Sequence, residues 1–389
     1  GKTRVIAKIA YELMKRGERV LISSHTNRAV DNAIELLPIE KTLRVGRPEK
    51  VLEHIKPYLL SYRAKEVLGQ RLKEIEQKIK STLEGIRKVQ NYLRESKNLY
   101  DRNKFRNTLS VLKKELHVKI RERNDMVRRA AEELVNKVPI IGATLVKSQL
   151  YPLRDLAFDT VIIDEASQAS ITLALLAMIK AKKWIVIGDH KQLLPIFKSI
   201  DKISLREELG AFSGLLSRYK HRHLWLQIHY RSHPDIIGFS AEHVYEGKIK
   251  AHESCYNKRL VLKVKPKLEV IDPEKPVVFI HIESKDESIE GSRRNLKEAL
   301  IIIEIIKDLI RCGLDMESIG IITPYRAQRA LIIELLRDKV KRLENLEVNT
   351  VDAFQGREKD VVIFDVTDTT NFRFSTCLLY TSPSPRDRG

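Results

Sequence analysis

With 389 residues, the chain is long enough for two or three domains of about 150 residues each. Hydrophobic residues make up 43% and charged residues 32%, which excludes an intrinsically disordered chain, and no apolar run approaches the roughly 20 residues of a membrane span. Lys and Arg number 71 against 52 Asp and Glu, so the net charge of +19 favours a polyanionic partner, with nucleic acid as the first candidate.

The first 60 residues alternate between helix and strand patterns. An amphipathic helix is expected directly after Thr3, and a second one over about residues 28–37. The apolar runs RVLISS at 19–24 and TLRV at 42–45 are typical of buried strands. This alternation predicts βαβ units and therefore a parallel sheet with helices on its faces.

Residues 61–136 follow a different pattern. They contain no proline, and their apolar residues recur at helical spacing in two series that are separated near residues 97–103. We therefore expect two long helices folded back on each other. Residues 61–140 hold 21 Lys plus Arg against 11 Asp plus Glu, about half of the chain's excess charge. Either a solvated hairpin or a contact with nucleic acid accounts for this charge.

The alternating pattern resumes after the hairpin, and a second α/β series begins near Leu224. The fold class predicted by this order is α/β, with two parallel-sheet domains and a long helical hairpin inserted in the first. The first series is completed by expected strands at 139–144, 160–166 and 183–189. The second series has expected strands at 277–282, 318–323, 346–351 and 361–366, and expected helices at 293–311 and 327–340.

The last thirteen residues, CLLYTSPSPRDRG at 377–389, lose the apolar periodicity of the preceding chain. They resemble the translation of a common transposase sequencing adapter. We therefore interpret this tail as a processing artefact rather than as part of the fold, and we expect the natural protein to continue past Thr376.

Three segments carry the residue types of phosphate chemistry. Gly1-Lys2-Thr3 matches the end of the phosphate-binding loop GxxxxGK[ST], in which the Lys and the hydroxyl bind phosphates and magnesium. The apolar strand VIIDEA ends in Asp164 and Glu165, which suit a magnesium ligand and a base that polarises the attacking water. Gln192, in the loop GDHKQLLP after the next strand, could hydrogen-bond a γ-phosphate oxygen.

These segments belong to an ordered set of seven motifs. The set comprises GKT, SHTNRAVDN (24–32), DEASQ (164–168), GDHKQLLP (188–195), HYRSHP (229–234), ITPYRAQ (322–328) and TVDAFQGREKDVVI (350–363). In order and approximate spacing it resembles the superfamily I helicases, most closely the branch that contains the nonsense-mediated decay helicase, senataxin and the immunoglobulin mu-binding helicase. The resemblance covers about residues 1–374 and implies two RecA-like domains of the P-loop NTPase type.

The resemblance implies a role in ATP binding or hydrolysis for each matching residue. Glu165 would be the catalytic base, Asp164 would bind Mg²⁺ together with Thr3, and Gln192 would sense the γ-phosphate. Arg231 would be the arginine finger, supplied across the cleft between the domains, because a guanidinium stays charged and grips phosphate oxygens. The other residues expected to bind ATP are Gly1, Lys2, the base-stacking tyrosine Tyr230, Gln355, Gly356 and Glu358.

The same resemblance implies contacts with nucleic acid from loops in both domains. Hydroxyl and amide groups suit this task, since they grip the phosphate backbone without reading bases, so binding should be independent of sequence. The matching residues are Ser24, Thr26, Asn27, Asn32, Ala143 and Thr144 in the first domain and Thr323, Pro324 and Tyr325 in the second.

We therefore expect an ATP-dependent helicase or translocase that moves 5′ to 3′ along single-stranded DNA or RNA, acts as a monomer and uses ATP and Mg²⁺. RecA-like domain 1 is expected at 1–60 and 137–222, the hairpin at 61–136, and RecA-like domain 2 at 223–376. Three cysteines and an opening GKTRVIAKIA without an apolar signal core predict an intracellular, cytoplasmic protein.

Two other functions compete with this expectation. The glycine-rich part of the phosphate loop should precede Gly1, and the last helicase motif should follow Phe374. The printed residues by themselves are therefore expected to have little ATPase activity, although the parent protein should be an enzyme. The alternative is a non-catalytic fragment that binds nucleic acid. A phosphate-loop kinase or another small-substrate NTPase is disfavoured by the HYRSHP and DAFQGRE motifs of the second α/β series.

Overall fold

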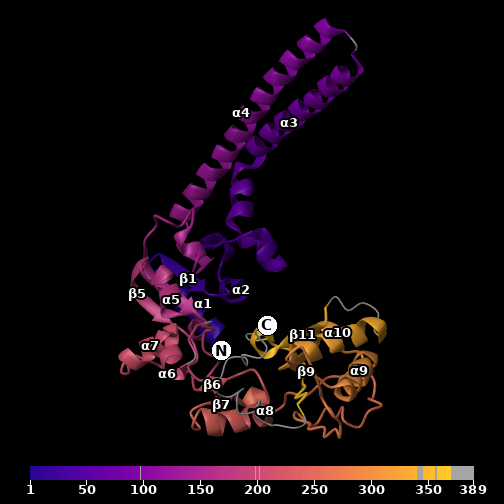
Figure 1. Ribbon diagram of the computed structural model, residues 1–389. Helices are drawn as coiled ribbons and strands as arrows, with labels where there is room; N and C mark the ends of the chain where they lie inside the picture. Colours follow the sequence, from indigo (N-terminus) through magenta and orange to yellow (C-terminus); the bar gives the residue numbers. More distant parts are fainter. Residues whose placement is uncertain (97, 198, 201, 340–344, 355–356, 369–389) are drawn as a thin grey trace. The chain divides into compact units, whose positions relative to one another are not determined.

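The chain forms two compact units, shown in Figure 1. The first unit is Thr3–Gly188, and the second unit consists of Gly1–Lys2 and the chain from Asp189 onward. The computed structural model describes residues 1–96, 98–197, 199–200, 202–339, 345–354 and 357–368. The tail at 377–389, whose interpretation as an artefact stays a prediction, lies outside the described residues.

The second unit begins earlier than the predicted domain boundary after residue 222, which stays a prediction. Contacts made directly after Gly188 account for the difference. The Tyr245 hydroxyl donates a hydrogen bond to Asp189 Oδ2 at 2.7 Å, and the ring centroids of His190 and Trp225 lie 5.5 Å apart. Side-chain contacts of this kind leave no trace in apolar periodicity.

The first unit is built on a five-stranded parallel sheet with the strand order β2-β3-β1-β4-β5, which confirms the predicted α/β fold. Every residue of β1 and β2 is buried, as expected for parallel strands covered on both faces. The strands are β1 (Val20–Ser24), β2 (Thr42–Val45), β3 (Ile140–Thr144), β4 (Phe158–Asp164) and β5 (Ala181–Val186), and the helices are α1 (Lys2–Lys15), α2 (Asn27–Ile34) and α5 (Ile171–Met178).

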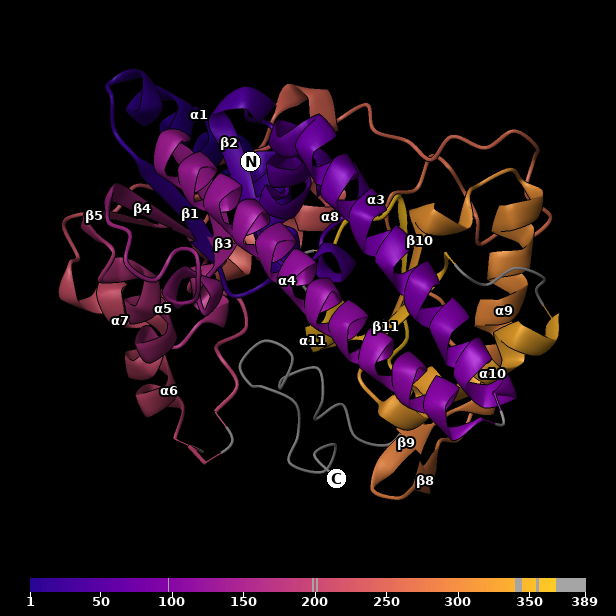
Figure 2. The ribbon, with the colours of Figure 1, turned by 90° about the horizontal axis from the view of Figure 1, so that it is seen from above.

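Two long helices, α3 (Leu60–Glu95) and α4 (Leu99–Lys137), pack along each other, which confirms the predicted hairpin (Figures 1 and 2). Leu72, Ile75 and Ile79 form the buried seam between them. Helix α3 bends at Gly69, whose φ of 44° is open to glycine because it lacks a Cβ atom.

The second unit contains a three-stranded parallel sheet, in which β10 (Ile319–Thr323) lies between β11 (Glu347–Thr350) and β12 (Val361–Phe364). Apolar side chains of α9 (Leu296–Arg311) and α10 (Arg326–Lys339) pack against this sheet, so the predictions for these five elements are confirmed. The remaining elements are α6 (Ile203–Leu209), α7 (Ala211–Arg218), α8 (Pro234–Phe239), α11 (Val351–Phe354), β6 (Ile228–His229), β7 (Lys250–Ala251), β8 (Glu287–Ile289) and β9 (Ser292–Arg294).

The strand predicted at 277–282 is wrong. Residues 277–282 form no strand, and the side chains of Val277 and Phe279 are 59% and 85% exposed. An apolar run indicates material that can pair in a sheet, but a strand forms only where a neighbour offers an aligned row of backbone donors and acceptors. Among the described residues, no helix is both long enough and apolar enough to cross a membrane.

Candidate nucleotide and nucleic-acid sites

The first sheet brings candidate residues from three separate motifs to one edge. In the strand register, Ser24 at the end of β1 pairs with Thr144 of β3 on one side and with Asp164 of β4 on the other. All three residues stand at the carboxyl ends of parallel strands, where open α/β sheets bind their ligands. The predicted nucleic-acid contacts and the predicted magnesium ligand are therefore neighbours in this unit.

The turn after β4 holds the two candidate acids in a fixed arrangement. Asp164 is 5% exposed, and its Oδ1 accepts a hydrogen bond from the Glu165 backbone N–H at 2.8 Å. Glu165 has φ 49° and ψ 40°, a left-handed conformation that is uncommon for a residue other than glycine and that concentrates at functional sites. The Ala166 N–H then donates to the Ile187 carbonyl at 2.9 Å, which anchors the turn to the end of β5.

The start of α2 is held by a buried network that the sequence did not indicate. Thr26 is the N-cap, with its Oγ1 accepting from the Ala29 N–H at 3.3 Å. Asn27 Oδ1 accepts from Arg44 Nη2 at 2.8 Å. Arg44 Nε in turn donates to Asp31 Oδ1 at 2.6 Å, with 0% and 1% of the two side chains exposed. Burial lowers the pKa of Arg44, and the Asp31 carboxylate opposes that shift.

The predicted nucleic-acid residues of the first unit differ in accessibility. Ser24 and Ala143 are both 0% exposed, so their side chains belong to the core. The other four are partly exposed and so remain accessible to a nucleic-acid strand: Thr26, Asn27, Asn32 and Thr144. In the motif Gly1-Lys2-Thr3, which is predicted to bind phosphate, α1 begins at Lys2. Its first turn includes Thr3, which is also partly exposed. Backbone N–H groups at a helix start favour phosphate.

In the second unit, the predicted γ-phosphate sensor is attached to an acid and a tyrosine. Gln192 Nε2 donates to Asp189 Oδ2 at 2.9 Å, and the same oxygen accepts from the Tyr245 hydroxyl. Burial and this hydrogen bond raise the pKa of Tyr245 well above its ordinary value. Gln192 itself is exposed, so a ligand could exchange with Asp189 for its amide.

The structure brings together two candidate residues from motifs that are far apart in the sequence. Arg231, the predicted arginine finger, forms an ion pair with Glu358 of the late motif. The two side chains are 65% and 61% exposed, so the pair is open to exchange with a phosphate. Tyr230 is 49% exposed, and its ring lies 4.4 Å from the ring of His252. Gln355 and Gly356, which are also predicted to bind ATP, lie outside the described residues.

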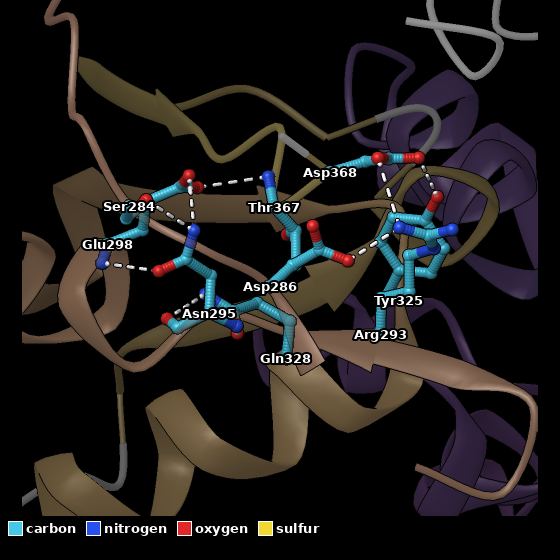
Figure 3. Close-up of polar contacts among 9 residues, drawn as sticks. All are labelled: Ser284, Asp286, Arg293, Asn295, Glu298, Tyr325, Gln328, Thr367 and Asp368. Carbon is cyan, nitrogen blue, oxygen red and sulfur yellow. Dashed lines mark hydrogen bonds and ion pairs between the residues drawn. The ribbon is translucent and has the colours of Figure 1, made fainter. Parts of the chain in front are cut away.

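The predicted nucleic-acid loop of the second unit enters a buried polar cluster, shown in Figure 3. Thr323 is 0% and Tyr325 is 8% exposed, and Pro324 between them is buried. The Thr323 and Thr367 hydroxyls lie 3.1 Å apart, and the Tyr325 hydroxyl donates to Asp368 Oδ2 at 3.2 Å. In this arrangement a nucleic-acid strand could reach the backbone of the loop, whereas the side chains of the loop are buried in the cluster.

The core of the cluster is the side chain of Gln328, which is fully buried. Its Oε1 accepts from the Asn295 N–H at 2.7 Å, and its Nε2 donates to the Asn295 carbonyl at 3.1 Å and to Asp365 Oδ2 at 2.7 Å. Glu298 Oε2 accepts from the Thr367 N–H at 3.0 Å. Burial, followed by the hydrogen bond with Asp365, raises the pKa of Glu298 from 4.5 to about 8. The cluster thus ties α9 and α10 to the end of β12.

In a second part of the same cluster, Arg293 links Asp286 to Asp368, which follows β12. Arg293 Nη1 donates to Asp286 Oδ2 at 2.6 Å and to Asp368 Oδ1 at 3.2 Å (Figure 3). Sequence reasoning identified Tyr325 but missed Asp286, Arg293 and Asp368. Gln328 ends the motif ITPYRAQ, and that membership was the one available signal for the cluster.

The donors present fit a magnesium ion bound together with phosphates. Mg²⁺ takes oxygen ligands and is usually held by one or two protein groups, with phosphates and waters completing its shell. Asp164 and Thr3 supply oxygen ligands of this kind. Within the described part of the chain, no group of three or more His, Cys, Asp or Glu residues could enclose a metal by itself.

Comparisons with known proteins find similarity in both units. Residues 1–200 match one family model described as an AAA domain, and residues 208–375 match another with the same description.

Three relatives illustrate the extent of the similarity. An uncharacterized ATP-dependent helicase of Methanocaldococcus jannaschii is 30% identical over 408 residues, covering 96% of this chain and 60% of the relative. The DNA-binding protein SMUBP-2 of Rattus norvegicus is 30% identical over 384 residues, covering 93% and 36%. The Drosophila melanogaster homolog of regulator of nonsense transcripts 1 is 29% identical over 380 residues, covering 93% and 29%. The chain thus spans between 29% and 60% of the length of these relatives.

Proposed function

The chain belongs to the superfamily I helicases, in the branch of the nonsense-mediated decay and immunoglobulin mu-binding helicases, and from this premise we propose that it couples ATP hydrolysis to movement along an unpaired nucleic-acid strand. The proposed direction is 5′ to 3′, and the proposed working form is an intracellular monomer. The proposed substrate is single-stranded DNA or RNA, because every contact proposed for the motif loops is to the backbone.

The observation that carries the proposal is the register of the first sheet. Ser24 and Asp164 are paired residues on adjacent β-strands. The loop proposed to bind nucleic acid and the acid proposed to bind magnesium therefore lie at one edge of the same sheet. A small displacement of the β4 turn on loss of the γ-phosphate would therefore be felt by the neighbouring β1–α2 loop. The second register neighbour, Thr144, extends the same edge.

The chain's own residues support a specific division of labour in hydrolysis. Lys2 would bind the β- and γ-phosphates, and Thr3 and Asp164 would hold Mg²⁺, which neutralises charge on the phosphates when bound. Glu165 would orient the attacking water and accept its proton at a carboxylate oxygen. The left-handed backbone of Glu165 sets the direction in which its side chain leaves the turn beside Asp164.

The second unit would complete the reaction and transmit its outcome. Arg231 would leave Glu358 and bind the charge that develops on the transferred phosphoryl group, at the cleft between the two RecA-like domains. Gln192 would hydrogen-bond the γ-phosphate and return to Asp189 after phosphate release, since both partners of that exchange compete for the same amide. The exposed Tyr230 would stack on the nucleotide base.

ATP hydrolysis by the full-length protein, measured with and without a single strand, tests this proposal. We expect single strands to stimulate hydrolysis and Glu165→Gln to lower kcat by at least about 10²-fold, while ATP binding is retained. Glu132→Gln, an equal change in charge on the surface of α4, serves as the control and should leave the rate unchanged. Full activity in Glu165→Gln would contradict the assignment of the base. Strand binding by a wild-type protein that hydrolyses no ATP would favour the non-catalytic alternative.

A further inference from the structure

The positive charge of the hairpin is concentrated near its tip. Residues 87–114 hold nine Lys and Arg against two Asp and Glu, a net charge of +7. Residues 61–86 hold six against four, and residues 115–140 hold six against five. The stems of the two helices are therefore nearly neutral, and the distal third, residues 87–114, carries most of the excess charge. A hairpin that needed charge only for solubility would have no reason for this distribution.

In the described part of the distal third, the basic side chains have no ion-pair partner within the protein, and all of them are exposed. The stem behaves differently: Lys119 pairs with Glu115 at 2.5 Å, and Arg128 pairs with Glu132 at 3.1 Å. The charge at the tip is thus available to an external polyanion.

Aromatic side chains are interspersed among these cations. Tyr92 and Tyr100 are 55% and 76% exposed, and Leu99 beside them is 72% exposed. The Tyr92 ring stacks on Phe105 at 5.9 Å, which holds one face of Tyr92 outward. Exposed rings within a basic surface suit an unpaired strand, because free bases stack on the rings while cations bind the phosphates. The bases of a duplex are already stacked on each other, so their faces are not available to the aromatic rings.

The distal third is remote from the motif loops of the same unit. Helix α3 begins at Leu60, and a rise of 1.5 Å per residue places Arg87 about 40 Å along the helix from that point, slightly less because of the bend at Gly69. Figure 1 shows both helices projecting away from the sheet of the first unit. A strand bound here would make a contact separate from that at the carboxyl edge of the sheet.

We propose that the distal third of the hairpin is a second binding surface for an unpaired nucleic-acid strand, which combines phosphate contacts from Lys and Arg with base stacking on Tyr92 and Tyr100. The inference rests on the proposed function in that the protein acts on nucleic acid. The partner is a single strand; a duplex or an acidic protein surface is an outcome of the test. Such a surface would retain the strand while the motif loops release and rebind it.

A pair of charge-matched variants of the protein tests the phosphate contacts. The tip variant is Arg102→Gln/Lys104→Gln/Arg106→Gln, and the control is Lys73→Gln/Lys78→Gln/Lys80→Gln on the exposed face of the stem. Each removes three positive charges. Fluorescence anisotropy with a labelled single strand of about 40 nucleotides, titrated at several salt concentrations, reports the affinity.

The expected result is specific to the tip. Loss of three phosphate contacts lowers the slope of log affinity against log salt by about 2, since each contact to a single strand contributes about 0.7. The stem variant should keep the wild-type slope. Equal losses in both variants would show that only the overall field of the protein attracts the strand, and this would overturn the proposal.

Tyr100→Ala tests the stacking contact, with Tyr100→Phe as its control. The Ala variant should bind the single strand about tenfold more weakly and bind a duplex with unchanged affinity, while the Phe variant keeps wild-type binding. An equal loss with the duplex, or competition by an acidic polypeptide at equal charge concentration, would overturn the assignment of an unpaired strand. ATP hydrolysis at saturating strand should be normal in all these variants. Absence of any strand binding or hydrolysis in the wild-type protein would instead refute the proposed function.

Discussion

Replacing Asp31 with Asn should destabilise the first unit strongly. The Asp31 carboxylate lies 2.6 Å from Arg44 Nε, with 1% and 0% of these side chains exposed. Asn keeps the shape of the side chain but removes its charge, so the guanidinium stays buried without its counter-ion. Loss of one partner from a buried ion pair costs about 3–5 kcal/mol, a large share of the roughly 5–15 kcal/mol that stabilises a typical domain.

A surface pair provides the matched control for this change. Arg128 Nε and Glu132 Oε1 also form an ion pair, at 3.1 Å, but 64% and 42% of their side chains are exposed. Glu132→Gln should therefore change the free energy of unfolding by less than about 1 kcal/mol. Urea unfolding gives the overall effect, and hydrogen exchange of peptides from β1 and β2 localises it, since the two units need not unfold together.

The double variant Asp31→Asn/Arg44→Gln separates the buried charge from the lost packing. It leaves no uncompensated guanidinium, so it should be more stable than the sum of its single variants predicts. Because Arg44 also donates to Asn27, Asp31→Asn should weaken single-strand binding at temperatures where the unit is still folded. Equal destabilisation by Asp31→Asn and Glu132→Gln would refute the reasoning.

Three further results are expected. A Cβ atom added at Gly142 would lie 2.8 Å from a side-chain carbon of α2, so Gly142→Ala should destabilise the protein by about 1–3 kcal/mol. A Cβ atom added at Gly85, inside α3, would lie 3.9 Å from its nearest neighbour, so Gly85→Ala should stabilise the protein by about 0.5–1 kcal/mol. The urea midpoints of the two variants should therefore shift in opposite directions. Arg231→Ala should lower kcat by about 10³-fold or more without changing the urea midpoint, since its ion pair is exposed, and a normal kcat would exclude an arginine finger. The pKa of Glu298 is about 8 in the folded protein against 4.5 in the unfolded chain, so the folded state holds the proton more tightly. The contribution of this group to stability is therefore complete below about pH 4.5 and is lost as the pH rises through 8. Glu298→Gln should flatten that decline, and an unchanged pH profile of thermal unfolding would contradict the shift.

The regular elements could be predicted from the sequence because their signals are local. The strand runs RVLISS and VIIDEA are continuous apolar stretches of the length that a doubly covered parallel strand needs, and both form in the structure. The long helices of the hairpin followed from apolar residues at helical spacing. Parallel strands also align their carboxyl ends, which is why Ser24 at the end of β1 has Asp164 of β4 on one side and Thr144 of β3 on the other.

The buried polar contacts could not be predicted, because they join segments whose pairing no periodicity encodes. Arg44 sits in the strand TLRV, where a charged residue indicates an exposed face. Its partners Asn27 and Asp31 on α2 nevertheless make it the largest fully buried side chain among the residues that the structure describes. The cluster around Gln328 likewise takes members from α9, from α10 and from the residues after β12. The prediction of a strand at 277–282 is wrong for the opposite reason. The apolar run is present in the sequence, but no neighbouring strand pairs with it.

Strand displacement by the full-length protein tests the central proposal most directly. The substrates are a labelled duplex with a 5′ single-stranded overhang and the same duplex with a 3′ overhang, each incubated with ATP or with a non-hydrolysable analogue. We expect displacement from the 5′ overhang alone, in the presence of ATP alone, and its loss in Glu165→Gln. Displacement that proceeds equally without hydrolysis, or a protein that binds both substrates tightly and separates neither, would contradict an ATP-driven motor.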